Sequence, residues 1–180
     1  ARVTLVSGPS SLEAPYGVEV VGVETAVEMH DAVVDRIGSA DVSVFAAAVA
    51  DFRPVDPSDT KVKREKSGSE LEVTLEANPD VALDTRDARK DGSVTVGFAL
   101  ETNDLLENAG RKLERKGFDL LVANDATEEG AGFGVATNRV TILDRDGGED
   151  ALPLLSKDEV AERLLDRISG RLTGGEDRDD

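Results

Sequence analysis

Short apolar runs alternate with helical segments along most of this 180-residue chain. Residues 2–7 and 18–23 have the β-branched composition of buried strands. The nearly all-apolar stretch 42–50 predicts a central parallel strand that is covered on both faces. Capping boxes at Thr25–Glu28 and Ser156–Glu159 indicate where two helices begin. This alternation predicts an α/β protein whose sheet is parallel or mostly parallel, with helices on both faces.

The remaining elements follow from the same signals. Strands are predicted at 71–76, 95–99, 118–123, 140–143 and 151–154, and helices at 27–37, 78–89, 103–116 and 157–168. The alternating strand 71–76 belongs to an edge or to a smaller β excursion, because two prolines and a basic loop separate it from the preceding strand. Ligands of such sheets bind at the carboxyl ends of the strands. We therefore expect the site in the loops that follow Ser7, Ala50, Ala99 and Asn124.

Composition limits the class of protein. Residues 1–172 are treated as one domain, and 173–180 as an acidic, disordered tail. The chain has no cysteine, one histidine and no apolar run long enough to span a bilayer, so we expect a cytoplasmic protein without a thiolate or histidine-rich metal site.

The net charge of −17 is spread through every segment. A dispersed negative charge of this size repels nucleic acid, which we exclude as a partner. The surface resembles that of proteins from halophilic archaea, where salt screens self-repulsion. The alternative is an ordinary acidic enzyme, and weak folding at low salt would distinguish the two.

Lysine is scarce, with seven in the chain, and five of the seven lie in two short stretches. Lys61, Lys63 and Lys66 share a loop, and Lys112 and Lys116 share a helix face, where like charges repel. A polyphosphate would offset this repulsion. The alternative is that neighbouring glutamates neutralise both lysines on a solvated face.

Two further stretches have possible ligand roles. Asp51 follows the small residues 46–50 at a strand end, where it would hold a divalent cation or a ribose hydroxyl. The alternative is an aspartate that begins a loop and hydrogen-bonds its own backbone. Phe52 is a candidate for stacking on a base, or a simple loop anchor. The glycine-rich segment 130–134 lacks the spacing of a dinucleotide fingerprint and precedes a strand, so we interpret it as a flexible loop or turn.

Several motifs occur in one order and at fitting intervals: Ala46-Ala47-Ala48-Val49-Ala50-Asp51-Phe52-Arg53-Pro54, Lys61-Val62-Lys63-Arg64, Asn78-Pro79-Asp80, Gly97-Phe98-Ala99-Leu100-Glu101-Thr102, Arg111-Lys112 through Lys116-Gly117-Phe118-Asp119-Leu120, and Ala123-Asn124-Asp125. In this set, which covers nearly all of residues 1–170, the chain resembles the phosphopantothenate-cysteine ligases (phosphopantothenoylcysteine synthetases). Six ordered motifs are more specific than any single one.

The resemblance implies a Rossmann-like fold, a homodimer and a ligase that uses CTP and Mg²⁺. In that family 4′-phosphopantothenate and L-cysteine are joined through an acyl-cytidylate, with release of pyrophosphate and then CMP. It also implies a decarboxylase fused upstream, as is common in the family, and no flavin on this segment. The same family begins with an Asn-containing segment that would precede Ala1, so we expect this chain to be N-terminally truncated and catalytically incomplete.

Site residues follow from the motifs of the family. Lys61 is the expected catalytic residue, on a loop that reaches the dimer partner. The expected nucleotide-binding residues are Ala50, Asp51, Phe52, Pro79, Asp80, Val81, Ala82, Phe98, Lys112 and Lys116. Asp51 is also the expected metal ligand, and Lys63 and Asn124 are expected to meet phosphate or substrate. The last position of the family's basic motif is Arg64 here, and its role is left open because arginine and lysine differ in geometry.

Two other functions are compatible with the composition. A nicotinamide-dependent oxidoreductase would use the same kind of fold, although the chain has no fingerprint for the dinucleotide. A nucleotide-binding domain without turnover would use the same pocket. Preference for NADH over CTP would indicate the first, and binding without pyrophosphate release would indicate the second.

Overall fold

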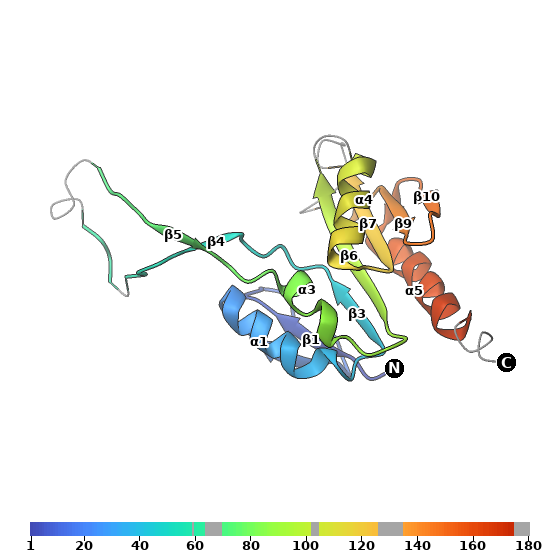
Figure 1. Cartoon of the computed structure of the whole chain (residues 1–180), viewed down its shortest axis with the longest axis horizontal. Helices are drawn as coiled ribbons and strands as arrows, with labels where there is room; N and C mark the ends of the chain where they lie inside the picture. The colour runs from blue at the N-terminus through green and yellow to red at the C-terminus, as the bar shows by residue number, and fades with distance from the viewer. Residues whose placement is uncertain (59, 64–69, 102–104, 126–134, 175–180) are drawn as a thin grey trace. The chain divides into compact units, whose positions relative to one another are not determined.

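The computed structural model describes residues 1–58, 60–63, 70–101, 105–125 and 135–174. The chain folds into two compact units (Figure 1). Unit one comprises Ala1–Val33 and Ala48–Val81, and unit two comprises Val34–Ala47 and Ala82–Asp180.

Unit one begins with two parallel strands. Strand β1 (Thr4–Ser7) pairs with β2 (Glu19–Gly22), which confirms both predicted strands. Their predicted burial is wrong, because Leu5 and Val20 are 40% and 43% exposed. A β-branched composition reports strand propensity more directly than it reports burial.

The predicted β excursion is present as a two-stranded antiparallel arm (Figure 1). Strand β4 (Phe52–Pro54) pairs with β5 (Leu75–Ala77), and a further hydrogen bond joins Val55 N to Thr74 O at 3.0 Å. The paired strand is shorter than the predicted 71–76. Leu71, Val73 and Leu75 are 63%, 54% and 54% exposed. The alternation therefore identified an extended segment, but neither of its faces is packed.

Helix α1 (Ala26–Ile37) begins at the predicted capping box. Glu28 N donates to Thr25 Oγ1, and Thr25 N donates to Glu28 Oε2, both at 3.1 Å. The amides of Glu24 and Thr25 donate to the Glu28 carboxylate and lower its pKa. These reciprocal bonds satisfy amide groups that a helix N-terminus leaves unpaired.

Unit two contains a five-stranded mixed sheet in the order β10-β9-β7-β6-β3. Its strands are β3 (Val42–Phe45), β6 (Val94–Glu101), β7 (Leu120–Asp125), β9 (Val140–Asp144) and β10 (Glu149–Ala151). Strands β3, β6 and β7 are mutually parallel, and β9 and β10 are antiparallel to their neighbours. The predicted α/β class, with a Rossmann-like sheet that carries helices on both faces, is confirmed.

The parallel strand predicted at 42–50 is present, but it is shorter than predicted and is not central or fully covered in unit two. In unit two β3 is an edge strand, it ends at Phe45, and Val44 is 50% exposed. Residues 46–50 are not in a strand. Small apolar side chains suit a buried strand and a close-packed loop equally well, so composition does not distinguish the two.

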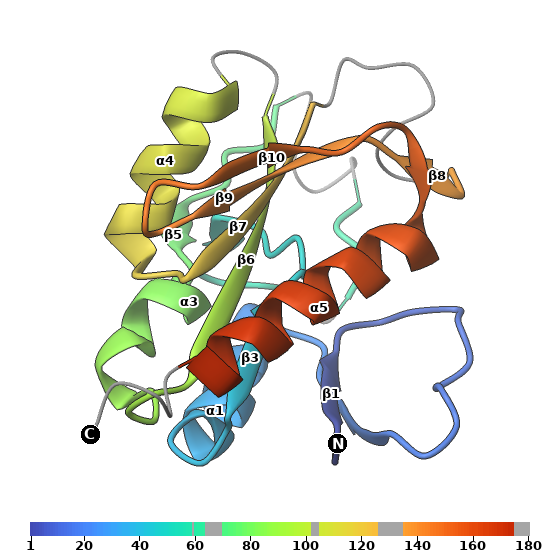
Figure 2. The same cartoon turned by 90° about the vertical axis from the view of Figure 1, so that its right-hand side faces the viewer.

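Two helices cover opposite faces of this sheet (Figure 2). Helix α4 (Leu105–Lys116) packs through Ala109 and Leu113 on the odd-numbered positions of β6 and β7. Helix α5 (Lys157–Gly174) packs through Val160, Leu164 and Ile168 on the even-numbered positions. Alternation of side chains along each strand separates the two cores.

The remaining elements of unit two are short. They are α3 (Val81–Asp84, which starts at the last residue of unit one), the 3-10 helix η1 (Arg86–Ala88), β8 (Thr137–Asn138) and β11 (Leu155–Ser156). The helix predicted at 78–89 is thus two short pieces.

Helix α5 starts at its predicted capping box, where Ser156 N donates to Glu159 Oε2 at 2.8 Å. The helix includes residues 173 and 174, the first two residues of the predicted tail. Among the described helices, none is long and apolar enough to cross a membrane.

Candidate functional site

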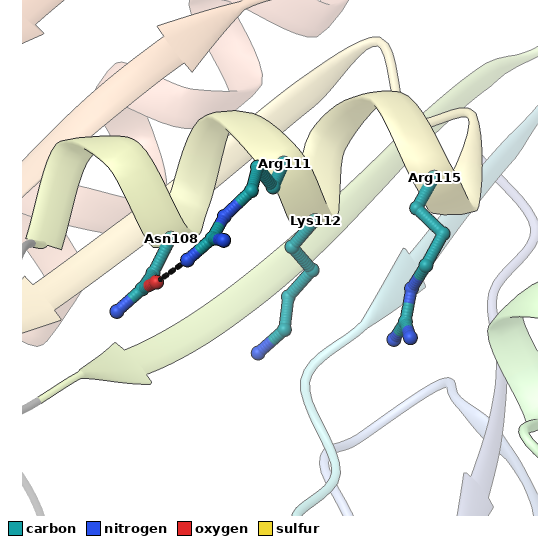
Figure 3. A pocket seen from close by; sticks show the side chains of 4 residues that line it. All are labelled: Asn108, Arg111, Lys112 and Arg115. Atoms are coloured by element: carbon teal, nitrogen blue, oxygen red, sulfur yellow. Dashed lines mark hydrogen bonds between the residues drawn. The ribbon is translucent and has the colours of Figure 1, made fainter.

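A basic pocket lies on the outer side of α4. It has a volume of about 440 Å³ and is lined by Asn108, Arg111, Lys112 and Arg115. Figure 3 shows the four side chains leaving the same side of the helix, with the Arg111 guanidinium hydrogen-bonded to Asn108 Oδ1. Three cations on one helix face of a chain with a net charge of −17 form a local positive field. Such a pocket is suited to an anion.

The helix places these residues by its period. They occupy positions i, i+3, i+4 and i+7, which form one stripe on an α-helix. Ala109 and Leu113, which are 0% and 7% exposed, form the stripe that faces the sheet. The apolar stripe therefore fixes the direction in which the basic stripe points.

Of the two predicted lysines on α4, only Lys112 lines this pocket. The predicted set omitted Asn108, Arg111 and Arg115. The spacing of these four residues in the sequence already forms one helical stripe, and its arginines bind phosphate with two parallel hydrogen bonds, so lysine content alone does not identify the site.

Phe98 lies on the other face of the sheet. It packs against the core beneath α5, whereas α4 covers the opposite face. The Phe98 ring therefore does not line the pocket beside Lys112. The parity of positions along β6 decides this, because positions 94, 96 and 98 all point towards α5.

Asn124 lies at the carboxyl end of β7, the edge at which a ligand is expected. Its Oδ1 is buried without a hydrogen-bond partner among the described residues, and the same is true of Asn138 Oδ1. Asn124 pairs in register with Val140, two residues beyond Asn138. Asn138 lies on β8, which pairs with β11 outside the five-stranded sheet, so one asparagine with an unsatisfied acceptor lies near the end of β7 and the other just before β9. Asn138, which is 7% exposed, was not among the predicted residues.

In unit one, Asn78 holds the segment that carries Asp51. Asn78 Nδ2 donates to Ala50 O and Asn78 N donates to Asp51 O, both at 2.8 Å. Arg53 Nη1 donates to Asn78 Oδ1 at 3.0 Å and to Ala77 O at 3.1 Å. The structure therefore brings the predicted motifs 46–54 and 78–80 together. Asp51 itself is exposed, with its backbone fixed by Asn78.

The other predicted residues of unit one fall into two groups. Phe52 is 60% exposed at the base of the arm, and Lys61 and Lys63 are exposed along it. Pro79 and Asp80 are partly buried, and the next two residues, Val81 and Ala82, are 7% and 6% exposed at the start of α3. Burial gives Val81 and Ala82 a packing role through their side chains, so only their backbone is available to a ligand.

Some predicted features lie outside the described residues. These are the basic residues Arg64 and Lys66, the cap at Thr102 and the glycine-rich segment 130–134.

A resident metal centre has no support among the residues that the structure describes, which contain no group of three or more histidine, cysteine, aspartate or glutamate side chains able to hold an ion. A lone carboxylate such as Asp51 fits a magnesium ion that is bound mainly by nucleotide phosphates and water.

Comparison with known proteins matches the chain to one family. Residues 1–172 match the family model described as DNA/pantothenate metabolism flavoprotein C-terminal domain. The coenzyme A biosynthesis bifunctional protein CoaBC of Vibrio vulnificus is 42% identical over 168 residues, which are 93% of this chain and 42% of that protein. A crystal structure of the C-terminal domain of CoaBC is similar with a TM-score of 0.78 and 35% identity, over 96% of this chain and 76% of that one.

A further relative has a different name. A cysteine/cysteine sulfinic acid decarboxylase from an unknown prokaryotic organism is 41% identical over 169 residues, which are 93% of this chain and 46% of that protein. The chain thus spans less than half the length of both curated relatives. The activity in either name belongs to a protein more than twice as long as the matched part.

Proposed function

The chain belongs to the DNA/pantothenate metabolism flavoprotein C-terminal domain family, and we propose that it catalyses the joining of 4′-phosphopantothenate to L-cysteine with CTP. In the first step the pantothenate carboxylate attacks the α-phosphorus and pyrophosphate leaves. In the second step the cysteine amine attacks the acyl carbon and CMP leaves with the bonding electron pair. The family supports a role in coenzyme A synthesis over the nicotinamide alternative.

The basic pocket on α4 is the observation that carries the proposal. A triphosphate concentrates negative charge that water alone screens poorly in a pocket, and Arg111, Lys112 and Arg115 supply three cations within one helical stripe. We assign the phosphates of CTP to this pocket. Lys116 lies one turn beyond Lys112, at the C-terminus of α4, and adds another positive side chain there.

The nucleotide contacts expected in unit one rest on the family motifs. We propose that Ala50, Asp51 and Phe52 and the segment Pro79–Ala82 contact the nucleotide, because Asn78 holds the two stretches together. Asp51 would hold Mg²⁺ with the phosphate oxygens, and the ion would neutralise charge on the leaving pyrophosphate. The Phe98 side chain packs in the core beneath α5, so Phe98 stays a predicted nucleotide contact only through its backbone on β6.

Lys61 is the proposed catalytic residue, with Lys63 beside it as a phosphate contact. Both side chains are exposed on the arm. Asn124 would meet phosphopantothenate. Its unsatisfied Oδ1 needs a donor, which the hydroxyl or amide N–H groups of the pantothenate portion provide and a phosphate does not.

We also propose a homodimer that forms through the arm. Phe52, Val55, Leu71, Val73 and Leu75 are between 51% and 63% exposed, a concentration of apolar surface that is unusual on a free monomer. A second copy would bury it. Light scattering of the arm variant Leu71→Glu/Val73→Glu, compared with the unchanged protein, would test this proposal.

A cytoplasmic location and a fused decarboxylase are also proposed, on the grounds of the family to which the chain belongs.

Two measurements test the function. The full-length natural protein should bind CTP with Mg²⁺ more tightly than NADH, and it should release pyrophosphate only when phosphopantothenate is present. Preference for NADH would refute the ligase. CTP binding without pyrophosphate release would instead indicate a nucleotide-binding domain without turnover.

A further inference from the structure

Arg89 joins two segments that the proposed function places at the nucleotide. Its Nη1 donates to Lys116 O at 2.9 Å and to Gly117 O at 2.8 Å, and its Nη2 donates to Ala82 O at 2.5 Å. One side chain therefore connects the end of α4, which carries the basic pocket, to α3, which begins with the segment assigned to CTP.

Two aromatic rings hold the guanidinium in place. Arg89 Cζ lies 5.7 Å from the ring centroids of both Phe45 and Phe118, within range of a cation-π interaction. Burial lowers the pKa of Arg89 and the charge of Asp119 raises it. Arginine titrates so far above neutrality that the group stays charged.

The C-terminus of α4 explains only part of these contacts. Phe118 N bonds Leu113 O at 3.0 Å, Gly117 N bonds Glu114 O at 3.2 Å, and Arg86 Nη1 bonds Arg115 O at 3.3 Å. Arg89 completes the set at Lys116 O. All four carbonyls that a helix end leaves unpaired are thus satisfied. The bond to Ala82 is additional to this capping.

The same guanidinium carries one cost beside its stabilising contacts. Arg89 Nε is buried without a hydrogen-bond partner among the described residues, and a buried unpaired donor costs about 1–3 kcal/mol. An apolar side chain at this position would avoid that cost but would leave the carbonyls of Ala82, Lys116 and Gly117 without this donor. Arg89 therefore fixes a geometry between α4 and α3 that an apolar side chain could not impose.

We propose that Arg89 is a positioning residue for the nucleotide: it fixes the basic stripe of α4 at a set distance from α3, so that both meet one triphosphate. The inference rests on the proposed function. Arg89 touches backbone oxygens rather than substrate, so it acts through Lys112 and its neighbours. Its loss should weaken CTP binding more than it slows the chemical step.

The test compares Arg89→Met with Arg145→Met in the full-length natural protein. Arg145 is a matched control, because it pairs with the Asp119 carboxylate at 2.7 Å in the same unit without touching α3. Arg89→Met should raise the KM for CTP about tenfold, as expected when contacts are displaced, and leave kcat and the KM for cysteine within about twofold. Arg145→Met should leave the KM for CTP unchanged even where its Tm falls equally.

Arg89→Lys keeps the charge, but a lysine cannot reach all three carbonyls. This variant replaces Arg89→Met in the test if Arg89→Met does not fold. It should raise the KM for CTP by an intermediate factor. An Arg89 variant whose KM for CTP matches that of the control, or whose kcat alone falls, would overturn the inference. Absence of CTP turnover in the unchanged protein would instead refute the proposed function.

Discussion

The ring of Phe118 lies directly against the backbone of Gly97. A Cβ atom built on Gly97 would come within 2.2 Å of Phe118 Cε2. Gly97 is part of the motif 97–102 that marks the family resemblance. The contact gives this glycine a packing reason, independent of any ligand, because only a residue without a side chain admits the ring.

Gly97→Ala should therefore destabilise unit two. Overpacking of this kind costs about 1–3 kcal/mol, since the Phe118 ring must move within a filled core. Gly110→Ala is the control, because a Cβ there meets nothing within 4 Å and a helix interior favours alanine by about 1 kcal/mol. Denaturant unfolding should show opposite signs for the two variants. Equal effects would contradict the packing assignment.

Asp144→Asn should loosen α5 from the sheet. Arg171 Nε donates to Asp144 Oδ2 at 3.2 Å, and both side chains are about one-fifth exposed, at 22% and 20%. Loss of the charged partner should cost about 1–3 kcal/mol. Asp150→Asn, which affects the more exposed pair with Arg167, should cost less than about 1 kcal/mol.

The same pair predicts a pH dependence. Burial by itself raises the pKa of Asp144, but hydrogen bonds from Asp146 N and from Arg171 outweigh it, and the pKa lies below the ordinary 3.8. A lowered folded pKa means that this stabilisation is present above about pH 4 and is lost as the pH falls through the folded value. The difference in unfolding free energy between wild type and Asp144→Asn should shrink over that acid range. A constant difference would refute the assignment.

Asn78→Ala should weaken nucleotide binding through Asp51. The variant loses the donor to Ala50 O and the acceptor for Arg53, which together orient the segment that carries the carboxylate. We expect the Kd for CTP with Mg²⁺ to rise about tenfold, in line with the loss of about 1–2 kcal/mol of hydrogen bonding. Asn78→Asp keeps the acceptor for Arg53, so its Kd for CTP should lie between those of the wild type and Asn78→Ala. Calorimetric titration would measure both.

Lys61→Gln should slow amide formation by orders of magnitude while the fold survives. The side chain is exposed, so its substitution leaves the core intact, and a transition-state contact to charge is worth about two to three orders of magnitude in rate. Lys63→Gln, two residues away on the same arm, should act mainly on the KM. Unchanged turnover in Lys61→Gln would remove Lys61 from the mechanism.

The net charge of −17 should make stability depend on salt. Raising NaCl from 0.01 M to 1 M shortens the screening length from about 30 Å to about 3 Å, which reduces repulsion among the acidic groups. We expect the Tm to rise by at least about 2–4 °C, equivalent to roughly 1 kcal/mol. Sucrose at equal osmolality is the control for general stabilisation. An unchanged Tm would show that the acidic surface carries no such penalty.

Local sequence signals determined the elements of this protein. Both capping boxes start helices where predicted, because their bonds join residues three apart and need no distant partner. The alternation of strands and helices likewise predicted the α/β class. The helical period of α4 contained its basic stripe.

Only the tertiary structure decided which elements are covered and which side chains meet. Strand β3 lies at an edge in unit two although its residues suit a centre, and Phe98 faces α5 although its motif suggests a shared pocket with Lys112. Arg89 reaches Ala82 and Lys116 through a path that no local pattern encodes. Burial and long-range hydrogen bonds depend on how elements pack, and packing is a property of the whole fold rather than of any segment.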